Sequence, residues 1–170
     1  MIKKIIATIL CGATIFAFVG CSNGKVEEKP VDKPAVEESV TKVSVKDVMK
    51  KLLDSKYITS PVEADEQRAT EVFGLKLDDV KEYAIAETEI NAQVGTIVLV
   101  EAKDGKVDAV KECVETYLKE LAEPAMGKYP AHIEAAENAK VEVKGNIVSL
   151  MVLNEEVNEE AHKALDEMLK

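Results

Sequence analysis

The segment TIVLVEA, residues 96–102, constrains the fold more than any other part of the chain. It is rich in β-branched residues, and its apolar positions fall on both sides of the strand that it predicts. A strand with one face in water alternates apolar and polar residues instead. We therefore expect residues 96–102 to form a central strand of a sheet.

A second strong signal is the pair Gly145-Asn146, which lies between two segments with alternating apolar residues. Glycine in this position is typical of a two-residue β-hairpin turn, which needs a positive φ angle. The turn places Val143 opposite Val148 and Lys144 opposite Ile147. One face of the hairpin then carries Val141, Val143, Val148, Leu150 and Val152, and the other carries Lys140, Glu142, Lys144 and Ser149.

Apolar periodicity predicts the helices. The first helix follows the capping signal Ser44-x-x-Asp47 and buries Val45, Val48, Met49, Leu52 and Leu53. A shorter helix over 65–73 ends at Gly74, and a strand over 83–89 precedes the central strand. A long helix follows Asp104-Gly105 and ends at Pro124 and Gly127.

The C-terminal part is expected to be irregular or weakly helical over 129–139 and to close with a helix that begins near Asn154 or Asn158. The inner side of that last helix carries Val157, Ala161, Ala164, Leu165 and Met168. The order α-α-β-β-α-β-β-α predicts one α+β domain over residues 44–170. Its sheet is antiparallel, has about four strands, and has the helices packed on it.

The first twenty residues differ from the rest of the chain. Lys3 and Lys4 are followed by fifteen uncharged residues, 5–19. A permanent membrane helix needs about 20 apolar residues, so this run has the length of a signal peptide. The alternative is an uncleaved signal anchor in which Cys21 is incidental.

The sequence Phe18-Val19-Gly20-Cys21 resembles the lipobox of bacterial lipoproteins, with Phe18 where that motif usually has Leu. The resemblance implies a signal peptide at 1–20, cleavage between Gly20 and Cys21, and attachment of lipid, palmitate included, to the Cys21 thiol. Residues 21–43 are rich in Lys, Glu, Val and Pro without an apolar stripe, which predicts a flexible tether. The chain is therefore expected at the outer face of the cytoplasmic membrane, anchored by its lipid.

Charge excludes one class of partner. The chain has a formal charge of -10, and removal of Lys3 and Lys4 with the signal peptide makes it -12. Such a surface repels nucleic acid and anionic lipid headgroups. With 4% aromatic residues and no Trp, few side chains can stack on bases. We expect no nucleic acid partner.

The sequence predicts no catalytic residue and no cofactor. Within the predicted domain, residues 44–170, neither a G-x-S-x-G nor an S-x-x-K motif is present; the matches at 20–24, 22–25 and 39–42 fall at the predicted cleavage site and in the predicted tether. His132 and Glu134 are the candidate metal ligands, but they lack H-E-x-x-H spacing, so no metal site is predicted. His162 is expected to be a surface histidine, and Cys113 a small apolar residue at the edge of a helix face rather than a reactive thiol.

Three blocks together carry a family resemblance: VFGLKLDDVKEYAI, the central strand running into EAKDGKVDAVKECVETYL, and NAKVEVKGNIVSLMV. Over about residues 44–169, their order and spacing resemble small lipoproteins of Gram-positive, Clostridium-type bacteria, the domain of unknown function 4358 family. The resemblance implies an extracytoplasmic lipoprotein of mixed α and β structure. It implies no activity.

The expected function is that of a membrane-anchored, non-catalytic binding or interaction module of the cell envelope. Its partner is a protein, a peptide or an envelope component. The negative charge favours a second hypothesis, the binding of a cation or small solute. An envelope enzyme ranks third.

Overall fold

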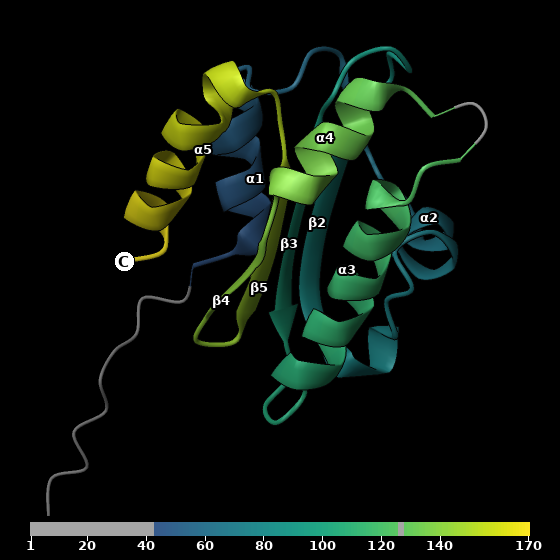
Figure 1. Cartoon of the computed structure of the whole chain (residues 1–170). Coiled ribbons are helices and arrows are strands. Elements are labelled where there is room, and N and C mark those ends of the chain that lie inside the picture. Colours follow the sequence, from purple (N-terminus) through teal and green to yellow (C-terminus); the bar gives the residue numbers. More distant parts are fainter. Residues whose placement is uncertain (1–42, 126–127) are drawn as a thin grey trace, which may run out of the picture. The chain divides into compact units, whose positions relative to one another are not determined.

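Five strands form one antiparallel sheet in the computed structural model, which describes residues 43–125 and 128–170 (Figure 1). The strand order is β1-β2-β3-β5-β4, so β3 (Thr96–Ala102) is central, as the sequence predicts. The others are β1 (Pro61–Glu63), β2 (Val80–Thr88), β4 (Val141–Lys144) and β5 (Ile147–Val152). The predicted signal peptide, Cys21 and residues 21–42 of the tether lie outside the described residues.

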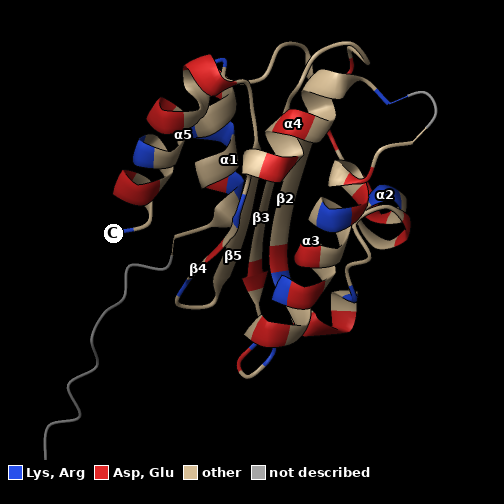
Figure 2. Cartoon of the chain, in the orientation of Figure 1, with Lys and Arg blue, Asp and Glu red and all other residues tan. Residues whose placement is uncertain are grey.

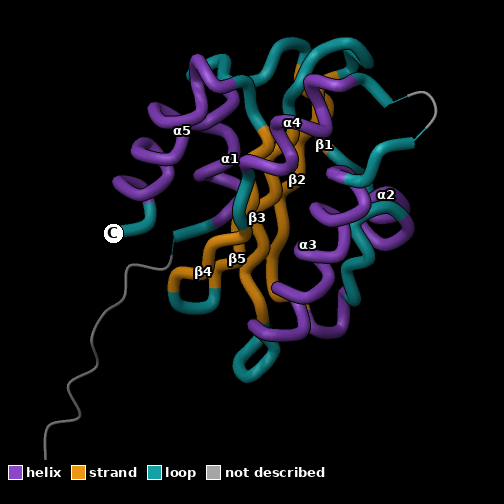
Figure 3. Tube along the Cα trace, in the orientation of Figure 1, coloured by secondary structure: helices purple, strands orange, loops and turns teal. Residues whose placement is uncertain are grey.

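Helices cover both faces of the sheet (Figures 1 and 3). On one face, α1 (Val45–Asp54) and α5 (Glu155–Met168) pack over Ile97 and Leu99. On the other face, α2 (Glu66–Glu71), α3 (Val107–Ala122) and α4 (Pro130–Asn138) belong to the cluster that contains Val98 and Val100. Alternate residues of β3 therefore contribute their side chains to two separate hydrophobic cores, one on each face of the sheet. This explains why the strand is apolar on both sides.

The expected number of about four strands is one too low. The additional strand is β1, where the sequence Ser60-Pro61 predicts only a break in the chain. Proline is tolerated as the first residue of an edge strand, because it needs no hydrogen-bonded N–H there. Pairing of Pro61 with Thr88 and of Val62 with Glu87 makes this segment a strand.

The segment expected to be irregular or weakly helical contains a regular helix, α4. Pro130 begins it at the first helical position, where the N–H that proline lacks would have no acceptor within the helix, and its buried residue is Ala136. A single 3-10 turn, Leu77–Asp79, also precedes β2, which starts three residues earlier than predicted.

The predicted hairpin has the predicted register. Val143 pairs with Val148 and Lys144 with Ile147 around a two-residue turn. Gly145 has a φ angle of 60°, a conformation that glycine adopts without strain. Asn146 donates a hydrogen bond from Nδ2 to Asp104 Oδ1 at 2.9 Å, which ties the hairpin to the turn that follows β3.

The capping hydrogen bond predicted at Ser44 is present, whereas the N-cap residue of α5 makes none with its side chain. Ser44 caps α1 and accepts a hydrogen bond from the backbone of Asp47, and Asp65 caps α2 by accepting from the backbone of Arg68 at 2.8 Å. Asn154, one of the two predicted alternatives, is the N-cap residue of α5. Among the described residues, no helix has the length and apolar character needed to cross a membrane.

Candidate binding pocket

A pocket of about 390 Å³ lies on the face of the sheet that carries α3 and α4. Its walls come from α2, the β2–β3 hairpin, α3, the segment from Lys128 to the start of α4, and the end of β5. Small-molecule pockets in proteins have volumes of about 300–1,000 Å³, so this pocket has room for a small polar molecule or for one protruding side chain of a partner.

Tyr117 lies in the wall of the pocket and is 9% exposed. Its ring packs on Phe73 with 4.3 Å between ring centroids, and its side chain is hydrogen-bonded to Thr96. Burial, reinforced by the negative charge of Glu87, raises the pKa of Tyr117 to about 12. The phenol is therefore neutral at physiological pH, and its oxygen acts as a hydrogen-bonding group rather than as a base.

An ion pair between Arg68 and Glu87 forms another part of the wall. Arg68 comes from α2 and Glu87 from β2, and the guanidinium Nε donates to the carboxylate. This hydrogen bond raises the pKa of Arg68. The Glu87 carboxylate is therefore already paired with a positively charged side chain of the protein, Arg68.

His132 and Tyr129 come from the first turn of α4 and from its N-cap. Their rings are 5.8 Å apart, centroid to centroid, and Tyr129 is 47% exposed. The His132 Nε2 atom is buried and has no hydrogen-bond partner among the described residues. A buried nitrogen without a partner costs about 1–3 kcal/mol, which is unusual in a folded protein and is often found at functional positions.

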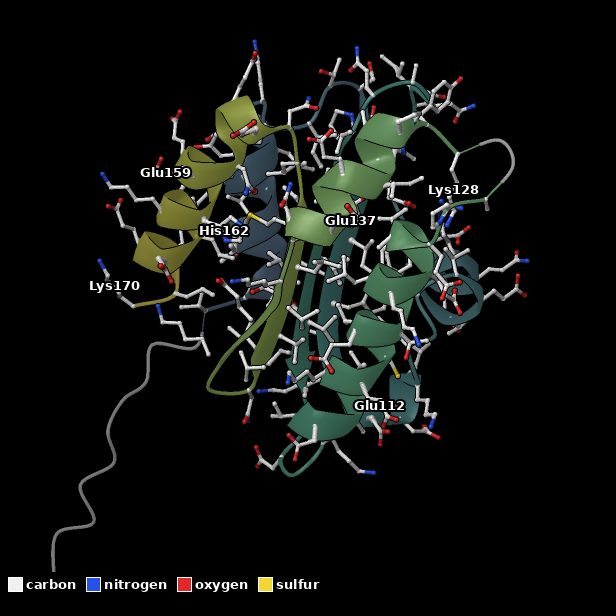
Figure 4. All side chains as sticks on the ribbon, in the orientation of Figure 1. Glu112, Lys128, Glu137, Glu159, His162 and Lys170 are labelled. Atoms are coloured by element: carbon white, nitrogen blue, oxygen red, sulfur yellow. The ribbon has the colours of Figure 1, made fainter. Side chains whose placement is uncertain are left out.

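Lys128 links the end of α3 to the pocket (Figure 4). Its ammonium donates to the carbonyl oxygens of Glu120 and Leu121 in the last turn of α3, and to that of Glu123 at 2.8 Å. These carbonyls have no partner within the helix, and a cation at this end is favoured by the helix dipole. Lys128 thus fixes one side of the pocket by capping α3.

The two candidate metal ligands do not meet. His132 lines the pocket described above, whereas Glu134 lines a different one, of about 490 Å³, between α4 and the start of α5. Residues two positions apart on a helix face different directions, which separates the two side chains. Within residues 43–125 and 128–170, no group of three or more His, Cys, Asp or Glu side chains is arranged to hold a metal ion.

The other residues discussed from the sequence are dispersed. Cys113 is partly buried and packs against the core under α3. His162 is half-buried on α5, with Nδ1 3.6 Å from Glu142 Oε2 (Figure 4). Both lie away from the pocket lining.

The pocket could not be predicted from the sequence. Tyr117 is predicted only as part of the apolar face of its helix, and Arg68 and Glu87 belong to no motif. These residues come from segments that are far apart in sequence, so no local spacing marks them. The one usable signal was His132 itself, a rare residue type in this chain.

The fold and the pocket define an α+β domain in which an antiparallel sheet carries helices on both faces and a polar pocket on one of them. The chain belongs to the DUF4358 family, a domain of unknown function, whose family model matches residues 54–153. The pocket residues discussed above all lie within this match. No curated protein and no solved structure matches the chain significantly.

Proposed function

We propose that this protein is a lipoprotein anchored through Cys21 at the outer face of the cytoplasmic membrane, and that its domain is a non-catalytic binding module. The partner is a protein, a peptide or another component of the cell envelope. The proposed anchor is supported by the signal-like residues 1–20, the sequence Phe18-Val19-Gly20-Cys21 and the tether. Two or more acyl chains hold a protein at a membrane far more firmly than one does.

The observation that carries the binding role is the buried, unpartnered Nε2 atom of His132 in the wall of the pocket. A hydrogen-bonding atom that is unused in the free domain can gain a partner when a ligand enters. The exposed ring of Tyr129 stands beside it and offers an apolar surface at the rim. Aromatic side chains with a polar tip are common anchors in binding sites.

The neighbouring groups support binding over catalysis. Tyr117, with its raised pKa, stays neutral, and the Arg68 and Glu87 charges neutralise each other. A general base works best with a pKa near the working pH, and the Tyr117 value of about 12 lies far from it. Such groups recognise a shape and a hydrogen-bond pattern.

Mass spectrometry of the protein from membranes of its host tests the anchor. We expect an N-terminal Cys21 carrying acyl chains. The variant Cys21→Ala is expected to remain unprocessed. An unmodified Cys21, or residues 1–20 still attached in the native protein, would contradict the proposed anchor.

Photo-crosslinking in intact cells tests the partner. A benzoylphenylalanine at Tyr129, on the rim of the pocket, is expected to trap a reproducible envelope component. The same label at Glu159, on α5 and so on the opposite face of the sheet, serves as the matched control (Figure 4). Equal capture at both positions, or none at Tyr129, would count against a partner at the pocket.

The volume of the pocket favours a second candidate, the binding of a small polar solute. A cation is less suited to this pocket, because the Glu87 carboxylate is already paired with Arg68, even though Asp and Glu occur along many of the helices and strands (Figure 2). The unfolding temperatures of the native protein and of His132→Phe are measured with a panel of ions and small solutes. This comparison distinguishes a specific solute site from a general effect on surface charge. Saturable stabilisation that His132→Phe abolishes supports a solute site, whereas stabilisation that vanishes with added salt indicates screening of surface charge.

A further inference from the structure

The two edges of the sheet differ. One edge is β1, which has three residues and begins with Pro61, a residue that cannot donate a backbone hydrogen bond. The other is β4, which has four residues and no proline; each edge exposes one valine, Val62 at 50% and Val143 at 44%. An edge strand presents N–H and C=O groups that can pair with another strand. Of the two, β4 is the better template.

The hairpin determines which groups of β4 face outward. Lys144 and Ile147 flank a two-residue turn, so they form a hydrogen-bonded pair, and such pairs alternate along the strands. Glu142 and Lys144 therefore direct their backbone groups toward β5. Val141 and Val143 direct theirs toward the open edge. The carbonyl oxygen of Asn146 accepts a hydrogen bond from the backbone N–H of Ala102, which belongs to β3 rather than β4. This direction agrees with the alternation along the hairpin.

We propose that two copies of this chain join β4 to β4, antiparallel and centred on Val143, so that one sheet runs through both. At this centre the two Val143 residues exchange their outward N–H and C=O groups, and their exposed side chains cover each other. Glu142 of each copy then lies opposite Lys144 of the other, on the same face.

Charge selects this register over its neighbour. Centring the pair on Glu142 would place the two Glu142 carboxylates opposite each other and Lys140 opposite Lys144, and like charges directly opposite are unfavourable. Lysines on an edge commonly prevent pairing. Here Glu142 lies two residues from Lys144 on the same face. The edge of one copy is therefore complementary in charge to the same edge of a second, antiparallel copy.

The two charged side chains are accessible for this contact. Glu142 is 53% exposed and Lys144 43% exposed, although each also lies near α5. The distances from Glu142 Oε2 to His162 Nδ1 and from Lys144 Nζ to Asp166 Oδ1 are both 3.6 Å, so these side-chain contacts are long, and Lys144 Nζ also donates to the backbone carbonyl of Asp166 at 3.2 Å. A closer partner across the proposed interface can replace them.

Charge reversal tests the register. The full chain is purified in a density-matched detergent and its association constant is measured by sedimentation equilibrium. We expect a dimer whose association constant falls about tenfold or more with Glu142→Lys or with Lys144→Glu. The double variant Glu142→Lys with Lys144→Glu restores opposite charges across the interface, so it is expected to recover the dimer. A merely destabilised fold would not recover in this way.

Proline substitution tests the backbone pairing. Val143→Pro removes an outward N–H and leaves the bonds to β5 intact, so we expect a folded monomer. The matched control is Glu63→Pro on the edge strand β1, which is expected to leave the dimer unchanged. A native chain that is monomeric across the concentration range, or a dimer that survives Val143→Pro in a folded protein, would overturn the inference. A double variant whose association constant is as low as those of the single variants would also overturn it.

Discussion

The hydroxyl of Ser44, at the start of α1, donates a hydrogen bond of 2.9 Å to the carboxylate of Glu82 on β2. The same Glu82 oxygen accepts the backbone N–H of Val45 at 2.8 Å. A strand residue thus satisfies an N–H group at the positive end of the helix, and an anion at this end is favoured by the helix dipole. This contact ties α1 to the sheet at one defined point.

Removal of the Glu82 carboxylate is expected to destabilise the protein. Glu82→Ala leaves the N–H of Val45 without its partner and should lower the free energy of unfolding by about 1–2 kcal/mol. Urea denaturation measures the loss. Glu89→Ala, at an exposed glutamate beyond the end of the same strand, should change it by less than about 0.5 kcal/mol. If the pair acts as one unit, Ser44→Ala combined with Glu82→Ala will cost less than the sum of the single changes.

Phe73 is expected to be one of the most costly residues to truncate. It is 1% exposed and packs on Tyr117, whereas its neighbour Val72 is 39% exposed. Phe73→Ala should leave a cavity and cost about 3–5 kcal/mol. Val72→Ala should cost less than about 0.5 kcal/mol. Thermal and urea unfolding of the two variants gives the comparison, and similar losses would show that Phe73 is not a core residue.

Alkaline pH is expected to destabilise the fold through Tyr117. Its pKa is raised from 10 to about 12 by burial, so the folded state favours the protonated phenol. This stabilisation is complete below pH 10 and is lost as the pH rises through 12. It amounts to about 3 kcal/mol at most. The free energy of unfolding of the native protein should fall more steeply over this range than that of Tyr117→Phe, and parallel curves would contradict the prediction.

Gly145 is expected to be costly to replace for a reason that lies in the backbone alone. An added Cβ would have no atom within 4 Å, but the φ angle of 60° disfavours residues with a side chain. Gly145→Ala should therefore cost about 1–2 kcal/mol in urea denaturation. Lys140→Ala, at an exposed position just before the same hairpin, should change the stability by less than about 0.5 kcal/mol. An equal effect of the two would argue against a strained turn.

The elements that sequence alone determined are those whose signals are local. Residues 96–102 are apolar on both sides and form the central strand, and the pair Gly145-Asn146 set the register of β4 against β5. The helix start at Ser44 also followed from a capping residue that acts within one turn. Each of these features depends on neighbours a few residues away, so its physical cause is visible in the sequence.

Tertiary structure decided how these elements are combined. Pro61–Glu63 became a strand only through its pairing with β2, and Ser149, predicted on the polar side of the hairpin, is buried because α1 and α5 cover that face. The pocket around Tyr117 and the bond from Ser44 to Glu82 likewise join segments far apart in sequence. Periodicity shows that a helix has an apolar face but not which face of the sheet it covers, because either choice buries that face equally well.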